Sequence, residues 1–195
     1  MFEGRLADWA LPSCPVAPRR TIAGVLEFHV PTRAEFGVRQ AWMSDPELMA
    51  YNAGWDVSHH GYDRDTGCIE WPESEWDAFA GRLALPADRH AYFYVRDTDT
   101  GEFIGHAHYT VEPDCAAHIG LNIVPRYRGR GRGEQVLRML VERIWQDTSA
   151  EEIVNDFEDQ REPALRVHRR CGFVPDRDTH STWGRPTRVW RLTRP

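Results

Sequence analysis

Arginine and glycine alternate in the stretch RYRGRGRG, residues 126 to 133, and these residue types are well suited to holding an anion. Guanidinium groups form charge-assisted hydrogen bonds with phosphate oxygens, and glycine lets the backbone approach such a group closely. A strand-like run ends just before this stretch, at Pro125, and a helical apolar pattern begins directly after it. Because a helix N-terminus presents unpaired N–H groups and partial positive charge, the sequence predicts a phosphate-binding loop between a strand and a helix.

Repeated Arg-Gly boxes also bind RNA, through charge and base stacking. Such boxes recur many times in disordered segments, whereas this stretch occurs once, between two ordered elements. The formal net charge of the chain is -6, and nucleic-acid-binding domains usually have a basic balance. We therefore expect a small phosphate-bearing ligand and no nucleic-acid partner.

Two pairs of histidines raise the question of a metal site. His106 and His108 share one face of a predicted strand, because side chains two apart in a strand point the same way. His59 and His60 are adjacent in a long loop, where neighbouring side chains are expected to point in different directions. Neither pair has a third ligand at a suitable spacing, so no metal is expected.

The hydrophobic periodicity predicts a mixed α/β domain with a largely antiparallel front half. A long loop, rich in turn formers and aromatic residues, occupies 54–74. Thr32 and Ser74 are predicted helix caps. The predicted strands are 21–30, 90–97, 102–112, 116–125, 151–158, 173–176 and 187–193, and the predicted helices are 33–43, 45–53, 74–85, a segment after the arginine-glycine stretch, and 162–172.

Two motifs resemble the GNAT N-acetyltransferase superfamily. The family's acetyl-coenzyme A (acetyl-CoA) loop, Arg/Gln-x-x-Gly-x-Gly/Ala after a Val/Ile-x-Pro strand end, is matched by Arg128, Gly131 and Gly133. The run ALRVHRRCGF, 164–173, is similar to the family's last helix and its Gly-Phe exit. The resemblance implies a single α/β, GNAT-like domain over 1–195, with a mixed, largely antiparallel central sheet flanked by helices and a splayed acetyl-CoA-binding strand. Within it, 1–20 is an N-terminal extension, 33–90 shapes the acceptor site and 91–173 is the acetyl-CoA-binding core.

The resemblance also implies acetyl-CoA as the acetyl donor, with no metal. The backbone of the splayed strand would pair with the donor, and one of its N–H groups would stabilise the oxyanion. The glycine-arginine loop would wrap the pyrophosphate, and His168 would lie beside the cofactor sulfur. The implied donor-binding residues are Leu121, Ile123, Val124, Arg128, Gly129, Arg130, Gly131, Arg132, Gly133, Glu134 and His168.

The implied catalytic residues depart from the family pattern. His168 occupies the position where many members carry a tyrosine acid, and it could protonate the leaving thiolate or simply pack there. His118 occupies the position of a frequent carboxylate base, with a half-buried polar side chain as the alternative. Asp156 and Glu158 are predicted to share a face of the strand that borders the acetyl site, where they would bind a cationic amine or relay its proton, or be solvated charges. Arg161 stands near the place of a frequent asparagine.

The region before the core is predicted to bind the acceptor through aromatic rings and carboxylates. The preferred acceptor is a primary amine of a small cationic molecule, an aminoglycoside antibiotic of the kasugamycin kind, which would make the protein a resistance enzyme. The alternatives are acetylation of a protein or peptide, a non-catalytic acetyl-CoA-binding module, and tryptophans and acids with merely structural or solvating roles. The predicted acceptor residues are Tyr51, Trp55, Asp56, Tyr62, Asp63, Glu70 and Trp71.

Composition sets the remaining expectations. The chain has 195 residues, of which 41% are hydrophobic, and it contains no run of ~18 apolar residues that would span a membrane. Four cysteines, Cys14, Cys68, Cys115 and Cys171, are far apart and predicted to be free thiols. A cytoplasmic protein with no membrane partner is expected. The apolar strand at 187–193 could pair across a homodimer interface.

Overall fold

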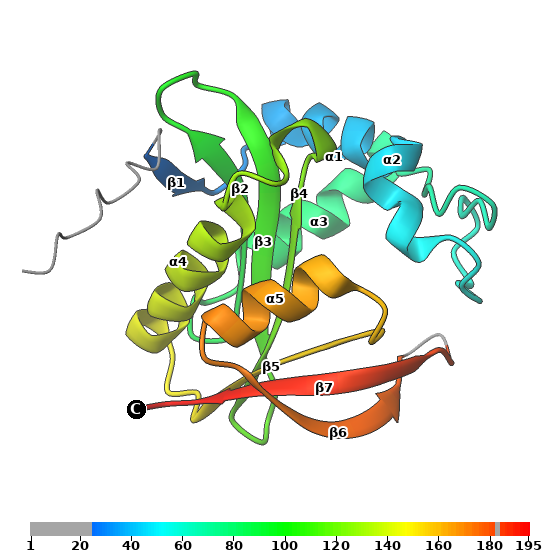
Figure 1. Ribbon diagram of the computed structural model, residues 1–195. Coiled ribbons are helices and arrows are strands. Elements are labelled where there is room, and N and C mark those ends of the chain that lie inside the picture. Colours follow the sequence, from blue (N-terminus) through cyan, green and yellow to red (C-terminus); the bar gives the residue numbers. More distant parts are fainter. Residues whose placement is uncertain (1–24, 182–183) are drawn as a thin grey trace, which may run out of the picture.

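A seven-stranded sheet organises the part of the chain that the computed structural model describes, residues 25–181 and 184–195 (Figure 1). The strand order is β1-β2-β3-β4-β5-β7-β6. All neighbouring strands pair antiparallel except β4 and β5, which are parallel. The predicted mixed, largely antiparallel sheet is therefore confirmed. The strands are β1 Leu26–His29, β2 His90–Asp97, β3 Phe103–Val111, β4 Ala116–Ile123, β5 Glu152–Phe157, β6 Val174–His180 and β7 Pro186–Thr193.

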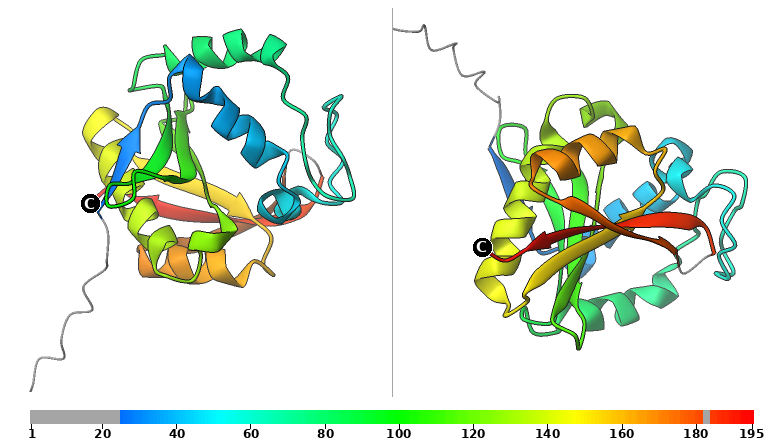
Figure 2. Two further views of the ribbon diagram at one scale, coloured as in Figure 1. Left: turned by 90° about the horizontal axis from the view of Figure 1, so that it is seen from above. Right: turned by 60° about the horizontal axis from the view of Figure 1, so that its bottom comes forward.

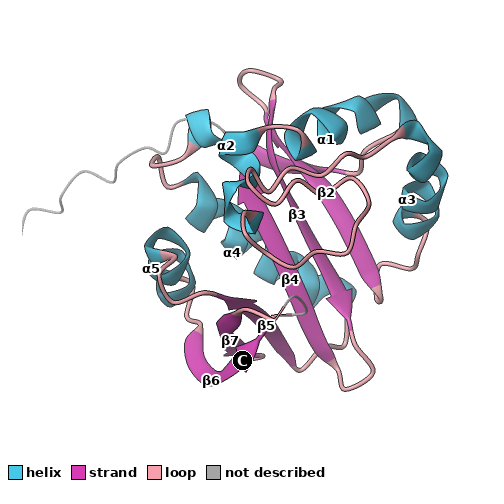
Figure 3. Ribbon diagram, turned by 90° about the vertical axis from the view of Figure 1, so that its right-hand side faces the viewer, coloured by secondary structure: helices cyan, strands magenta, loops and turns pink. Residues whose placement is uncertain are grey.

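Helices cover both faces of this sheet (Figure 3). On one face, α4 buries a stripe formed by Val136, Leu137, Leu140 and Ile144, spaced as an amphipathic helix requires, and α5 lies beside it. On the other face, α1 and α3 enclose an aromatic cluster centred on Phe36 and the β2 tyrosines. The helices are η1 Arg33–Glu35, α1 Phe36–Met43, α2 Pro46–Met49, η2 Ala50–Asn52, η3 Glu73–Glu75, α3 Trp76–Leu83, η4 Pro125–Tyr127, α4 Arg132–Asp147 and α5 Glu162–Arg170.

Strands β4 and β5 pair over a short distance only. Three residues of β4, from Ala116 to His118, are in register with Glu152 to Val154 of β5. Figure 1 shows the two strands running apart beyond this point. Since hydrogen bonds alternate along an antiparallel pair, and Val124 N–H donates to the Ile104 carbonyl of β3 at 2.9 Å, the N–H groups of Leu121 and Ile123 point toward the opening. The predicted splayed strand is confirmed.

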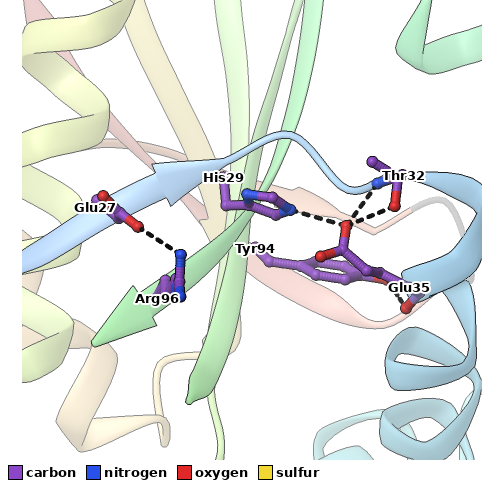
Figure 4. Close-up of polar contacts among 6 residues, drawn as sticks. All are labelled: Glu27, His29, Thr32, Glu35, Tyr94 and Arg96. Carbon is purple, nitrogen blue, oxygen red and sulfur yellow. Dashed lines mark hydrogen bonds and ion pairs between the residues drawn. The ribbon is translucent and has the colours of Figure 1, made fainter. Parts of the chain in front are cut away.

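The start of α1 is fixed by one carboxylate. Glu35 accepts hydrogen bonds from the Thr32 N–H and hydroxyl at 2.8 and 2.9 Å, and its Oε2 lies 2.8 Å from Nε2 of His29 at the end of β1 (Figure 4). The same figure shows the Tyr94 hydroxyl donating to the Glu35 carbonyl. The predicted helix cap at Thr32 is therefore confirmed. The Ser74 prediction is wrong, because Ser74 lies within η3 and α3 begins after Glu75 with no side-chain cap.

The end of the chain also differs from expectation. Strand β7 pairs with β5 on one side and with β6 on the other, and the three strands lie together in Figure 2. The prediction that this strand pairs across a dimer interface is therefore wrong, because β7 has no open edge. Strand β6 is also longer than the predicted 173–176, since it extends to His180.

Several expectations concern segments and residue types away from the sheet. The predicted extension at 1–20, with Cys14, lies outside the described residues. Cys68, Cys115 and Cys171 are free thiols. Within the described ranges, none of the helices is both long and apolar enough to cross a membrane.

Candidate active site

The gap between β4 and β5 opens into a cavity of about 640 Å³, called the splay cavity below. One wall is the separated end of β4, from Gly120 to Ile123, and another is the loop that enters α4. Strand β5 and α5 complete it, with arginines Arg161, Arg166 and Arg170 contributed at or just before α5. An extended, cation-rich cavity along an unpaired strand edge is suited to a long ligand that carries phosphate groups.

The loop at the mouth of the splay cavity takes its shape from glycine and arginine. Gly129 and Gly131 have φ values of 76° and 75°, a left-handed conformation that side chains other than glycine rarely adopt, and Gly131 is the residue from which α4 begins. Arg128 folds back on β4, where its Nε donates to the Ile123 carbonyl at 2.8 Å and its Nη2 to Asn122 Oδ1 at 3.3 Å. Burial lowers the pKa of Arg128 from its usual value. Gly131, Gly133 and Glu134 bring the start of α4 to the wall of the cavity.

Most, but not all, of the predicted donor-binding residues line this cavity. Arg132 turns inward instead, and its Nη2 lies 2.7 Å from Asp97 Oδ2 with both side chains largely buried. Val124 uses its N–H for β3, and the exposed Arg130 lies outside the cavity lining. The predicted residues that do line it are Leu121, Ile123, Arg128, Gly129, Gly131, Gly133, Glu134 and His168.

His168 lies in the wall of the splay cavity with its ring fully engaged. Its Nδ1 faces the Ala164 carbonyl at 2.8 Å, and because a carbonyl only accepts, Nδ1 carries the proton. Nε2 then accepts from the amide of Asn155 at 3.0 Å. Burial lowers the pKa of His168 to about 4, so the ring is neutral near pH 7. The one proton of the neutral ring is thus donated to the Ala164 carbonyl, and Nε2 is occupied by Asn155.

A second cavity, of about 330 Å³, lies on the α1 and α3 side of the sheet and is called the histidine cavity below. Its walls come from α1, α2, η2, α3, β2 and β3, and His90, His106 and His108 all line it. Tyr51, His106 and His108 line both cavities. The two cavities therefore meet at these three side chains, which makes this the point where a ligand in one could react with a ligand in the other.

The two central histidines are held in a row of parallel rings. Tyr92 on β2 stacks on His106 and His108 with centroids 5.4 and 6.0 Å apart, and His106 and His108 are themselves 6.4 Å apart. Burial, and then the charge of Arg39, holds the pKa of His106 well below its usual range, and the same two causes lower that of His108 to about 4. Both rings are therefore neutral near pH 7. The shared face of these two histidines can be predicted from their spacing in the sequence.

The predicted acceptor residues lie mostly elsewhere. Tyr51 lines both cavities, whereas the rest serve the loop between η2 and η3 or the aromatic core. Asp56 pairs with Arg64 at 3.0 Å, and the Tyr62 hydroxyl donates to the Asn52 carbonyl at 2.6 Å, which fixes the loop beside Tyr51. Asp63 accepts two backbone N–H groups within its own turn, and Trp71 is buried against Phe36. The predicted residues that line neither of these two cavities are Trp55, Asp56, Tyr62, Asp63, Glu70 and Trp71.

The remaining predicted catalytic residues are dispersed. His118 is exposed on β4, before the strands separate, and lines neither cavity. Asp156 lines the splay cavity and accepts from the Thr187 hydroxyl at 2.9 Å. Glu158 is 4% exposed, and its Oε2 lies 4.0 Å from Arg161 Nη1 with no hydrogen-bond donor among the described residues. Of this set, Asp156 alone shares a cavity with the histidine row.

His59 and His60 do not point in different directions as expected. Their rings stack at 4.6 Å, and both Nε2 atoms face Glu75 Oε1, at 3.4 and 4.0 Å. These three side chains are the group in the described ranges whose potential ligand atoms lie within 4.8 Å of one another. However, His59 Nδ1 accepts the Gly61 N–H, so a neutral His59 carries its proton on Nε2 and directs it at Glu75.

Comparison with known proteins defines the class. The chain belongs to the acetyltransferase (GNAT) family, whose pattern it matches over residues 55–173, and it is therefore an acyltransferase. The sequence has no match among curated proteins.

Solved structures share the fold at low sequence identity. Spermidine N-acetyltransferase from Vibrio cholerae in complex with CoA and spermine has a TM-score of 0.68 at 13% identity, covering 86% of this chain and 95% of that chain. The aminoglycoside acetyltransferase AAC(6')-Ib in complex with ribostamycin and coenzyme A has a TM-score of 0.67 at 17% identity, covering 87% and 93%. An acetyltransferase (GNAT family) from Bacillus anthracis has a TM-score of 0.65 at 12% identity, covering 86% and 94%.

Proposed function

We propose that this GNAT acetyltransferase transfers the acetyl group of acetyl-CoA to a primary amine of a small molecule held in the histidine cavity. The observation that carries the proposal is that the two cavities share Tyr51, His106 and His108. A thioester that enters along β4 and an amine that enters from the opposite side of the sheet would meet at these three side chains.

The proposed reaction is direct attack of the amine on the thioester. The amine nitrogen forms a bond to the acetyl carbon, the carbon–sulfur bond breaks, and the amine proton passes to His106 or His108. The Tyr51 hydroxyl supplies a proton to the departing CoA thiolate. The N–H groups of Leu121 and Ile123, which point toward the opening, are placed to stabilise the oxyanion. His118 and His168 have no catalytic role in this scheme.

The size of the histidine cavity favours a small molecule over a protein or peptide acceptor. About 330 Å³ lies at the lower end of the range for small-molecule sites. A peptide acceptor would need a groove open at both ends to admit the chain on either side of the reacting amine. A non-catalytic acetyl-CoA-binding role would leave the histidine row and the second cavity without a purpose.

One observation favours an aminoglycoside as the acceptor, and another disfavours it. Solved structures of AAC(6')-Ib with ribostamycin and with kanamycin share the fold of this chain. The carboxylates predicted to bind a polycation, however, are absent from the described lining of the histidine cavity. A small amine is therefore proposed without restriction to amino sugars.

The test is release of free CoA thiol from acetyl-CoA in the presence of single amines. The panel comprises kanamycin, spermidine, amino acids, simple amines and a short peptide with a free N-terminus. Turnover with small amines and not with the peptide is expected. Turnover with the peptide alone, or binding of acetyl-CoA with no turnover of any amine, would contradict the proposal.

A further inference from the structure

Among the described residues, the charged side chains that line the histidine cavity are two arginines. Arg39 from α1 and Arg82 from α3 line it together with the three histidines. Among the described residues of this lining there is no aspartate or glutamate. A cavity with this charge attracts an anionic group and repels a second ammonium group on an acceptor.

Arg39 packs against three aromatic rings and has no acidic partner among the described residues. Its guanidinium carbon lies 5.2, 5.0 and 5.1 Å from the ring centroids of Trp71, Phe79 and Tyr92. Its Nη1 donates to the Tyr92 hydroxyl at 2.8 Å, and its Nε is buried without a hydrogen-bond acceptor in the described part of the chain. A half-buried guanidinium usually pairs with a carboxylate, because desolvation of its charge is otherwise uncompensated.

Arg82 brings a second guanidinium to the same aromatic ring. Its guanidinium carbon lies 5.5 Å from the Phe79 ring, which Arg39 also contacts. Arg82 is exposed, and none of the ion pairs among the described residues includes it. Two causes lower the pKa of His90 in the same cavity: burial, which is the larger, and the positive charge of Arg82. The arginines thus place two guanidinium groups around one wall of the cavity.

The other walls are apolar. Trp42, Met43, Leu48, Met49 and Ile69 line the cavity beside the β2 and β3 rings. Such a surface binds a hydrocarbon or aromatic side chain and offers few hydrogen-bond partners to the hydroxyl groups of a sugar.

We propose that the acceptor is an amine that carries a carboxylate, namely an amino acid with an apolar or aromatic side chain. Its carboxylate pairs with Arg39, assisted by Arg82, its side chain contacts the apolar wall, and its amine faces His106 and His108. This inference rests on the proposed function, since it names the acceptor class of the same site.

The first experiment compares acceptors that differ in one charge. L-phenylalanine and L-phenylalaninamide have nearly the same shape, but only the former carries a carboxylate. We expect kcat/KM to be about tenfold to 100-fold higher for phenylalanine, as one or two charge-assisted hydrogen bonds predict. The comparison is stringent because the amide has the less basic amine and so the larger neutral, reactive fraction. L-leucine and 3-methylbutylamine form a second pair.

Variants then locate the discrimination. Arg39→Gln is expected to reduce the phenylalanine to phenylalaninamide ratio of kcat/KM at least tenfold, Arg82→Gln to reduce it less, and Arg39→Lys to retain part of it. Arg89→Gln is the matched control. Arg89 is exposed and directly precedes the cavity-lining His90 in the sequence, but it does not itself line the cavity. A melting temperature and a KM for acetyl-CoA, measured for each variant, separate loss of recognition from loss of fold.

Each outcome decides the question. Kanamycin or spermidine as the best acceptor, or equal use of phenylalanine and its amide, would overturn the inference while leaving the proposed acetyltransferase function standing. An unchanged ratio in the Arg39→Gln variant would likewise overturn it. Binding of acetyl-CoA with no acetylation of any amine would overturn the proposed function itself, and this inference with it.

Discussion

The splay cavity and the histidine cavity meet at the same three side chains, but they are built in different ways. A large part of the first comes from one continuous stretch, from Gly120 to Glu134, which supplies backbone groups and glycine turns. The second is assembled from side chains on α1, α2, η2, α3, β2 and β3. A site formed by main-chain groups of one segment can be predicted from a short motif. A site formed by side chains from several elements can be identified only once the fold is known.

The largest effects are expected for the residues that line both cavities. We expect either His106→Ala or His108→Ala to lower kcat about 100-fold to 10,000-fold, because removal of a proton acceptor has effects of this size. The KM for acetyl-CoA should change little, since both side chains lie at the end of the donor path. Steady-state kinetics with the best acceptor make the measurement. His118→Ala, on the neighbouring strand β4, is the control, and an effect of His118→Ala as large as that of either variant would contradict the assignment.

Arg132 tests whether the arginine-glycine stretch serves ligand binding alone. Arg132→Met leaves Asp97 buried without its ion-pair partner, and we expect a loss of about 3 kcal/mol in unfolding free energy, as for other broken buried pairs. Urea unfolding gives this value, and the KM for acetyl-CoA should remain near that of the wild type. A large rise in KM at unchanged stability would instead return Arg132 to the pyrophosphate site.

Gly131 tests the contribution of the backbone to the splay cavity. Gly131→Val forces a branched side chain into a left-handed conformation, which costs about 1–2 kcal/mol. Apart from its chain neighbours, Gly131 has no described atom within 4 Å of an added Cβ. A rise of about tenfold in the KM for acetyl-CoA is expected. Gly81→Ala in α3, where space is also open and φ is ordinary, should leave this KM unchanged.

The smallest effect is expected for Glu35. This residue bears on the histidine cavity, because it fixes the start of the helix that carries Arg39. Hydrogen bonding from His29, then from the Thr32 N–H, lowers the pKa of Glu35 from 4.5 to about 2. Its contribution to stability is therefore present above pH 4.5 and is lost as the pH falls toward 2. Glu35→Gln should lower stability by about 1 kcal/mol at pH 7, as loss of a helix cap does. The difference in melting temperature between the wild type and the Glu35→Gln variant should become smaller below pH 4.5. A difference that stays constant with pH would contradict this prediction.

The fold and the position of the splay cavity could be predicted from the sequence. Period-two strands and the α4 stripe are local patterns that predicted the sheet, and the motifs that resemble the GNAT superfamily predicted the splayed strand and a glycine loop beside it. The ion pair of Arg132 could not be predicted, because its partner Asp97 lies on a distant strand. Composition likewise does not reveal that Asp56 and Asp63 have partners within their own loop.

The acceptor side could not be predicted because its residues are scattered. Arg39, Tyr51, His90 and His106 come from four separate segments, and nothing in their local sequence distinguishes them from other arginines, tyrosines and histidines. The cue that was available was the shared face of His106 and His108, read together with the buried strands around them.

The short pairing of β4 with β5 has a consequence for amide hydrogen exchange. Along β4, the N–H of Val124 is bonded to β3, whereas the N–H groups of Leu121 and Ile123 face the opening. In deuterated water, neighbouring amides of one strand should therefore exchange at alternating rates, slow where β3 protects them and fast where no strand does. Binding of acetyl-CoA along this edge would slow the fast set, so that the amides of Leu121 and Ile123 would report occupancy of the site without any catalytic turnover.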